Sequence, residues 1–267
     1  MKDASVIRPI VFGRFAMIRK DSPLRNPPAS MAPEQRVAID GIRYVAEMIG
    51  LNAERLYTDL LSVTWIPESG PLPPRFFAFC LADAWSIVDN LWRLNLLVRG
   101  MRGLKKTPEL EVHLRALGKV EEFRHGFQHL NERVKVCASD RLPLWGTLGW
   151  LYCPNGPLKP SKIYLMVPGG LRSGEDPVIN PAGKVVQGVI DLVTLAAFGK
   201  QLELSSLLRT VSSLIVGLER GLGIASSGQP GGGADMLISL EYVPQTENAT
   251  HVSNPPGGIS PDPQPAI

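Results

Sequence analysis

The fold is decided by residues 109–134, ELEVHLRALGKVEEFRHGFQHLNERV, where apolar side chains recur at steps of three and four residues. The apolar positions are Leu110, Leu114, Leu117, Val120, Phe123, Phe127, Leu130 and Val134. This spacing is typical of one face of an α-helix, which completes a turn every 3.6 residues. We therefore predict one long amphipathic helix, with Thr107 as its N-cap and Pro108 at its first helical position.

A second long helix is predicted over residues 74–101, PRFFAFCLADAWSIVDNLWRLNLLVRGM, which are apolar on most sides. A helix that is apolar nearly all round lies at the centre of a bundle. The short connection RGLKKTP makes the two helices an antiparallel hairpin. Residues 33–50 and 52–65 are predicted as two further helices. The chain is therefore predicted to be mainly α, with an antiparallel helical bundle over residues 33–140.

Different patterns flank this bundle on both sides. Residues 1–32 are predicted to be an N-terminal extended segment followed by a Pro-rich loop. Residues 142–153 and 161–169 are short aromatic and β-branched runs that predict a hairpin, and residues 184–198 fit a third strand. Residues 202–223 predict an amphipathic helix that ends near Gly221. We expect residues 141–225 to form a small α+β appendage, and the Gly/Pro-rich residues 226–267 to be a mostly disordered tail.

The composition favours an ordinary globular protein of the cytoplasm. Of the 267 residues, 44% are hydrophobic and 20% are charged. No segment reaches the roughly 18–20 apolar residues that a membrane span needs, and Arg8 and Arg14 interrupt the N-terminus where a signal peptide would be apolar. The three cysteines show no Cys-x-x-Cys spacing, which predicts free thiols and no zinc site or disulfide framework.

Positive charge is concentrated in residues 91–135, which include the helix predicted over residues 109–134. The net charge is +3, and residues 91–135 hold ten Lys or Arg against five Glu. From Ser226 onward the chain has four acidic residues and no Lys or Arg. A moderate basic patch of this kind is compatible with an anionic partner such as RNA, without requiring one.

Polar side chains that can act on phosphate are grouped in the helix over residues 109–134. Arg124, His125, Gln128 and His129 lie there within six residues of chain. A guanidinium can bind phosphate oxygens, and an imidazole can take a proton from a ribose 2′-hydroxyl or give one to the leaving 5′-oxygen. These two groups suffice in principle for RNA cleavage without a metal. With four His and 18 Arg in the chain, an Arg–His pair at this spacing is expected by chance. The spacing alone is therefore no evidence of a catalytic site, and the neighbouring sequence has to support it.

Other interpretations of these residues stay open. His125 and His129 lie one helical turn apart, with Glu122 and Glu132 on the same face, and could form one edge of a metal site. A solvated helix face is the favoured alternative because further ligands are missing, so we assign no metal and no cofactor. Asp89, inside the apolar helix, is either a structural ion-pair partner of Arg93 or Arg124, or a group that positions Arg124.

The tryptophans are expected to serve packing. Trp85 and Trp92 are predicted to pack in the core or an interface, and Trp145 and Trp150 in the core of the hairpin. Base stacking is the minority interpretation for the latter two.

The order of three features resembles the HEPN superfamily, most of all its uncharacterised bacterial members. These features are an aspartate-bearing helix (residues 81–94), a short basic linker, and a helix with Arg-polar-x-x-x-His near its end. The resemblance covers about residues 76–134. HEPN domains are helical bundles that are often dimeric. Many are metal-independent endoribonucleases of toxin–antitoxin and defence systems, and others are inactive binding modules.

The resemblance implies that Arg124 and His129 are the catalytic pair and that His125 fills the polar position after the arginine. That position is more usually Asn or Asp, so His125 departs from the pattern. Asp89 and Gln128 are the other supporting candidates. The implied partners are a second copy of the chain, RNA, and a protein such as an antitoxin.

Helix geometry adds a constraint to this site. At about 100° per residue, Arg124 and His129 point roughly 140° apart around a straight helix. Convergence on one phosphate therefore needs a distorted helix end or a second chain, and the resemblance implies the second chain. The leading hypothesis is a HEPN-like, dimeric, metal-independent endoribonuclease. The alternative is a catalytically inactive helical bundle that serves as a binding or scaffold protein.

Overall fold

The computed structural model describes residues 15–66, 70–156, 159–169 and 179–226, with the short pieces 230–231, 235–237 and 239. The chain up to residue 234 forms one compact unit. Its helices are α1 (Pro33–Val63), α2 (Phe76–Gly100), α3 (Pro108–Gly118), α4 (Glu121–Gln128), α5 (Leu130–Asp140) and α6 (Leu204–Ser226), with a 3₁₀ turn, η1, at Pro23–Arg25. The strands are β1 (Thr147–Tyr152), β2 (Lys162–Met166), β3 (Ile190–Ala197) and β4 (Lys200–Glu203).

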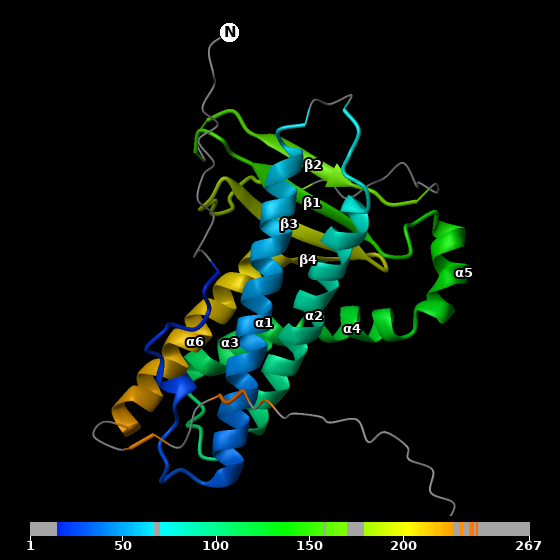
Figure 1. The fold of residues 1–267 in the computed structure, drawn as a ribbon. Helices are drawn as coiled ribbons and strands as arrows, with labels where there is room; N and C mark the ends of the chain where they lie inside the picture. The colour runs from blue at the N-terminus through cyan, green and yellow to red at the C-terminus, as the bar shows by residue number, and fades with distance from the viewer. Residues whose placement is uncertain are drawn as a thin grey trace, which may run out of the picture. The chain divides into compact units, whose positions relative to one another are not determined.

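The chain is mainly α, as predicted, and the antiparallel pair α1–α2 forms its centre (Figure 1). α1 is one helix where the sequence predicted two separated at Gly50. Gly50 does not end the helix. Its role is steric, because a Cβ atom there would lie 2.4 Å from the carbonyl oxygen of Phe15. The glycine therefore allows the N-terminal segment to approach α1 closely.

The single long helix predicted over residues 109–134 is wrong, because the chain forms three helices there, α3, α4 and α5. The first break lies at Lys119–Val120, just after Gly118. The second lies at His129, whose φ of −110° and ψ of 37° are not helical. The apolar stripe is buried from Leu110 to Phe123, but Val134 is 50% exposed. The last apolar positions keep helical spacing without facing the core, since α5 turns away from α4 (Figure 1).

The predicted hairpin is confirmed as β1 and β2, which are part of an antiparallel sheet with the order β2-β1-β3-β4. The third predicted strand is β3, and it pairs with the other edge of β1. β4 was not predicted. It follows β3 through Phe198 and Gly199, which both have positive φ, at 55° and 74°. Two such residues form the turn whose twist matches a β-hairpin.

The sheet is packed on both faces. Leu148 and Trp150 of β1 belong to the main core shared with the helices. Leu151 and Cys153 face the other way and form a smaller cluster with Ile179 and Leu192. This alternation follows from the two-residue repeat of a β-strand.

The main core crosses the boundary predicted between residues 140 and 141. It contains side chains of α1 to α4, of the sheet and of α6. α6 packs against α3, α1 and β3, and it continues past Gly221 to Ser226, so the predicted stop at Gly221 is wrong. Of the predicted extended segment and tail, residues 1–14 and most residues beyond 226 lie outside the described part of the chain.

A buried carboxylate holds β3 to α6. Asp191 is fully buried beside an irregularity in the β1–β3 pairing, where Leu192 has a φ of 51°. Its carboxylate accepts hydrogen bonds from the backbone N–H of Gln187 and of Leu192, both at 2.7 Å, and from Arg209 Nη1 at 3.0 Å. Burial alone would raise the pKa of Asp191, but these three donors outweigh it and lower the pKa.

The three cysteines are free and buried, as predicted. Burial, with a smaller effect of Asp59 and Asp83, raises the pKa of Cys80 to about 12, so its thiol stays protonated at neutral pH. Among the helices that the structure describes, none has both the length and the apolar character to cross a membrane.

Candidate functional site

An open groove of about 730 Å³ lies beside α2 and α4. One wall is the exposed side of α2, with the small side chains Ala78, Ala82 and Ser86. Asp89 of α2 and Arg124 of α4 also line the groove. Small residues on this side of α2 leave room for a ligand or another chain to approach the helix backbone.

Three aromatic rings form the apolar part of the groove. Trp85 stacks on Phe127 with ring centroids 4.6 Å apart and 16° between the planes, and Phe127 meets Trp145 at 5.7 Å. Trp85 Nε1 donates a hydrogen bond to the carbonyl oxygen of Trp145 at 3.1 Å. Trp145 is 45% exposed, so the prediction that it lies in the hairpin core is wrong. Trp150 does lie in the core, stacked on Tyr164 at 5.2 Å.

Sequence patterns did not predict this aromatic wall. Phe127 follows the regular apolar spacing, which predicts a core position, whereas it is only partly buried. Trp145 reaches α4 from a segment that comes after α5. Contacts between residues that are distant in sequence leave no periodic signal.

Asp89 is paired with two arginines. Its Oδ1 accepts a hydrogen bond from Arg124 Nε at 3.1 Å, and its Oδ2 lies 2.6 Å from Arg93 Nη2. Arg124 Nη1 also donates to Gln128 Oε1 at 3.3 Å. We call Asp89, Arg93, Arg124 and Gln128 the guanidinium cluster. The guanidinium cluster therefore has two positive charges against one negative charge. The Arg124 and Asp89 side chains are each 32% exposed.

The two histidines form a separate group, which we call the histidine pair. The rings of His125 and His129 have centroids 4.6 Å apart, as expected for positions one turn apart. His129 Nδ1 lies 3.2 Å from Glu132 Oε1 in the first turn of α5, and the His129 side chain is 43% exposed. His129 therefore occupies the break between α4 and α5, accessible to solvent.

The structure brings Arg124 together with Asp89 and Gln128, but it does not bring Arg124 together with His129. The two share no contact within the described residues, and His129 does not line the groove. α4 turns Arg124 toward α2, whereas His129 contacts His125 and Glu132. The helix break at His129 therefore does not bring Arg124 and His129 together within one chain.

Within the described residues, the histidine pair has no third ligand that would complete a metal site. No group of three or more His, Cys, Asp or Glu suited to a metal occurs in the part of the chain that the structure describes. Two imidazoles and Glu132 at the surface form at most the edge considered from the sequence.

The turn between β3 and β4 holds α4 in place. Phe198 packs against Gly126 of α4, where a Cβ atom would lie 2.6 Å from the Phe198 ring. Lys200 forms an ion pair with Glu122, and the Arg133 guanidinium lies 5.5 Å from the centroid of the Phe198 ring. The contacts of Phe198 with Gly126 and of Lys200 with Glu122 fix α4, the helix that carries Arg124.

We expect Gly126→Ala to lower the free energy of unfolding by about 1–3 kcal/mol, because an added methyl group must displace the Phe198 ring. Gly118→Ala is the matched control, since its Cβ would be in ordinary contact 3.8 Å from Asn95 Nδ2. Alanine is the better helix former, so that variant should be up to about 1 kcal/mol more stable than the wild type. Urea denaturation measures both. Equal stability of the two variants would contradict the close packing at Gly126.

No protein-family model, curated protein or solved structure matches this chain significantly. The resemblance to the HEPN superfamily therefore stays a prediction from the residues between 76 and 134.

Proposed function

We propose that this chain is a HEPN-like endoribonuclease that needs no metal and acts as a homodimer. Arg124 binds the scissile phosphate and stabilises its charge in the transition state, and His129 is the general acid and base. The observation that carries the proposal is the Arg124–Asp89 hydrogen bond of 3.1 Å at the edge of an open groove. It holds a guanidinium, still accessible to solvent, where a phosphate can reach it.

The chemistry requires one proton to be removed and one to be supplied. An imidazole nitrogen accepts the proton of the ribose 2′-hydroxyl, the 2′-oxygen attacks the phosphorus, and the 5′-oxygen leaves with a proton, giving a 2′,3′-cyclic phosphate. The Glu132 carboxylate at His129 Nδ1 favours the tautomer with the proton on Nδ1. Nε2 is then the nitrogen that accepts the proton.

The geometry supports a site completed by a second chain. Arg124 belongs to the guanidinium cluster, and His129 belongs to the histidine pair. Within one chain the two side chains therefore contact different residues. α2 also exposes the apolar side chains of Phe79 and Leu96. Exposed apolar side chains on a helix favour contact with another protein surface. In the dimer, Arg124 of one chain would act with His129 of the other.

The exposed ring of Trp145 supports a single-stranded substrate. Unpaired bases stack on aromatic side chains, and each stacked base contributes roughly 1–3 kcal/mol to binding. We therefore expect Trp145→Ala to weaken RNA binding by about tenfold or more. Trp65→Ala is the matched control because Trp65 is similarly exposed, at 50%, and does not line the groove. Fluorescence anisotropy with a labelled single-stranded RNA compares them, and equal affinities would exclude stacking on Trp145.

A second candidate function is RNA or protein binding without catalysis. The contacts of Arg124 favour it, because Asp89 and Gln128 already occupy two of its donor groups in the single chain. In this case the groove would bind a partner while His129 has no chemical role.

The decisive test is incubation of the purified protein with end-labelled single-stranded RNA, with and without EDTA. The proposal predicts cleavage that persists in EDTA and leaves 2′,3′-cyclic phosphate ends. Binding without cleavage would support the second function. Cleavage that EDTA abolishes would contradict the proposal and direct attention to the histidine pair as a metal site.

A further inference from the structure

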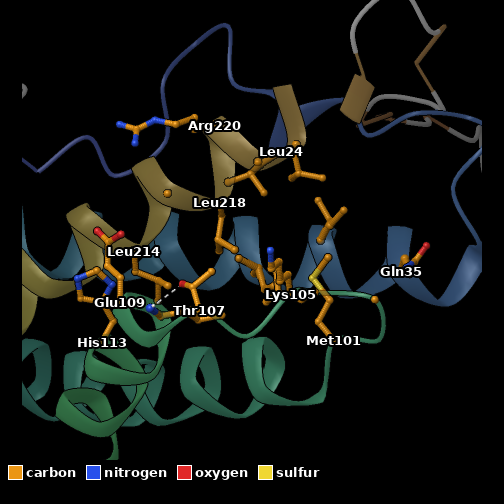
Figure 2. Close-up of a pocket in the computed structure, with 18 of the residues that line it drawn as sticks. Leu24, Gln35, Met101, Lys105, Thr107, Glu109, His113, Leu214, Leu218 and Arg220 are labelled. Carbon is orange, nitrogen blue, oxygen red and sulfur yellow. Dashed lines mark hydrogen bonds between the residues drawn. The ribbon is translucent and has the colours of Figure 1, made fainter. Parts of the chain in front are cut away.

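A second cavity, of about 470 Å³, is lined by α1, α3, α6 and the connection from α2 to α3 (Figure 2). It shares no lining residue with the groove beside α2 and α4. Its interior is apolar, and Leu24, Ile39, Ile42 and Leu214 in its wall are each at most 2% exposed. Its volume lies in the range of about 300–1,000 Å³ that is usual for sites of small molecules.

The α6 wall of this cavity contains two glycines. Gly217 and Gly221 lie one helical turn apart, and an added Cβ atom at either would meet nothing within 4 Å. Glycine inside a helix is less stable than alanine. Here the absence of two side chains keeps one wall of the cavity open.

An exposed lysine provides positive charge beside the apolar groups. Lys105 lies in the connection between α2 and α3, and Figure 2 shows its side chain beside Leu218 and Met101 with the ammonium end toward α6. Among the described residues Lys105 has no ion pair or hydrogen-bond partner. Arg220 points away from these groups in the same view.

The polar groups at the two ends of the cavity differ. Glu109 and His113 lie together near Leu214, one turn apart on α3 (Figure 2). Gln35, at the opposite end, donates a hydrogen bond to the Arg102 carbonyl at 2.9 Å. A ligand with one negative charge therefore finds its complement at Lys105, and Glu109 disfavours a second negative charge at the other end.

We propose that this cavity binds a carboxylic acid with an alkyl body, which places its carboxylate at Lys105 Nζ and its chain between α1 and α6. The apolar walls favour the alkyl chain because its burial removes apolar surface from water. One ammonium group suits a singly charged carboxylate, whereas a phosphate is usually bound by several donors or by arginine. The site is independent of the proposed RNA cleavage.

Decanoate is the probe for the full-length protein, used below its critical micelle concentration in isothermal titration calorimetry. We expect saturable binding of one decanoate per chain, and binding of decan-1-ol, which lacks the charge, that is roughly tenfold weaker. Lys105→Gln should weaken decanoate binding by a similar factor and leave decan-1-ol unaffected. Lys106→Gln is the matched control, because the neighbouring lysine does not line the cavity.

A second pair of variants tests the location of the alkyl chain. Gly217→Leu places a side chain into the opening and should abolish decanoate binding. Gly223→Leu makes the same change on the same helix outside the cavity and should leave binding intact. Circular dichroism checks that both variants are folded. Absence of decanoate binding to the wild type, equal binding by the Lys105 and Lys106 variants, or equal binding by the two glycine variants would each overturn the proposal.

Discussion

Arg124→Ala is expected to lower the rate of RNA cleavage by at least about 100-fold, because the variant loses the cation that stabilises the charge developing on the phosphate. Arg124→Lys keeps the charge but loses the planar guanidinium that binds Asp89 and phosphate together, so we expect a partial loss. His129→Ala should lower the rate by roughly 100- to 10,000-fold, the usual contribution of a general acid or base. Single-turnover cleavage of a labelled RNA measures all three rates.

Arg115→Ala serves as the control for loss of an arginine. Arg115 is exposed on α3, and no contact between it and the guanidinium cluster is found in the described part of the chain. Its replacement should leave the rate near that of the wild type. If Arg124→Ala and Arg115→Ala cleave RNA equally fast, Arg124 has no catalytic role.

Asp191→Ala is expected to lower the free energy of unfolding by about 3 kcal/mol, which is typical of removing one partner from a buried ion pair. The change leaves the backbone N–H groups of Gln187 and Leu192 without their acceptor. The loss is limited because Arg209 is 34% exposed and has Glu203 as a second partner at 3.5 Å. Urea denaturation measures it, with Asp140→Ala, an exposed position in the last turn of α5, as the control. A similar effect of the two substitutions would contradict the structural role of Asp191.

The same carboxylate predicts a dependence of stability on pH. The pKa of Asp191 is lower in the folded protein than the value of about 3.9 expected for an unfolded chain. Its contribution is therefore complete above the unfolded pKa and is lost as the pH falls through the folded pKa. Asp191→Asn should show a smaller loss of stability below about pH 4 than the wild type does.

Periodicity predicted the long helices because their apolar faces pack against a core. α2 follows its predicted segment closely, and α6 begins near its predicted start but continues to Ser226. The β1–β2 hairpin appears where aromatic and β-branched runs flank a Pro/Gly loop. The division between α4 and α5 had no such signal. Leu130 and Val134 keep the helical spacing, and only the position of the core shows that the chain turns at His129.

Backbone conformations that residues other than glycine rarely adopt caused the other differences between the predicted and the observed strands. Leu192, in the irregular part of β3, and Phe198, in the turn to β4, have positive φ without being glycine. Contacts from elsewhere in the chain accompany both, since Arg209 of α6 binds the carboxylate next to Leu192. The Phe198 ring packs against Gly126 of α4. Local sequence does not contain that information.

Helix geometry was informative at the candidate site. In a straight helix the angle between Arg124 and His129 would keep them from one phosphate, which left a distorted helix end or a second chain as the alternatives. The helix is broken at His129, and the two side chains still lie in separate contacts. The pairing of Asp89 with Arg93 and Arg124 was one of the two interpretations considered from the sequence. The groove itself was not predictable, because Trp145 enters it from a distant segment.

A mixing experiment decides whether the site is shared between two chains. Arg124→Ala and His129→Ala proteins, each inactive alone, are combined under conditions that allow subunits to exchange, and RNA cleavage is measured. If Arg124 of one chain acts with His129 of the other, the mixture should recover about a quarter of the wild-type rate, because half of the dimers are mixed and each mixed dimer has one complete site of two. No recovery from a mixture shown to contain mixed dimers would contradict a site built from two chains.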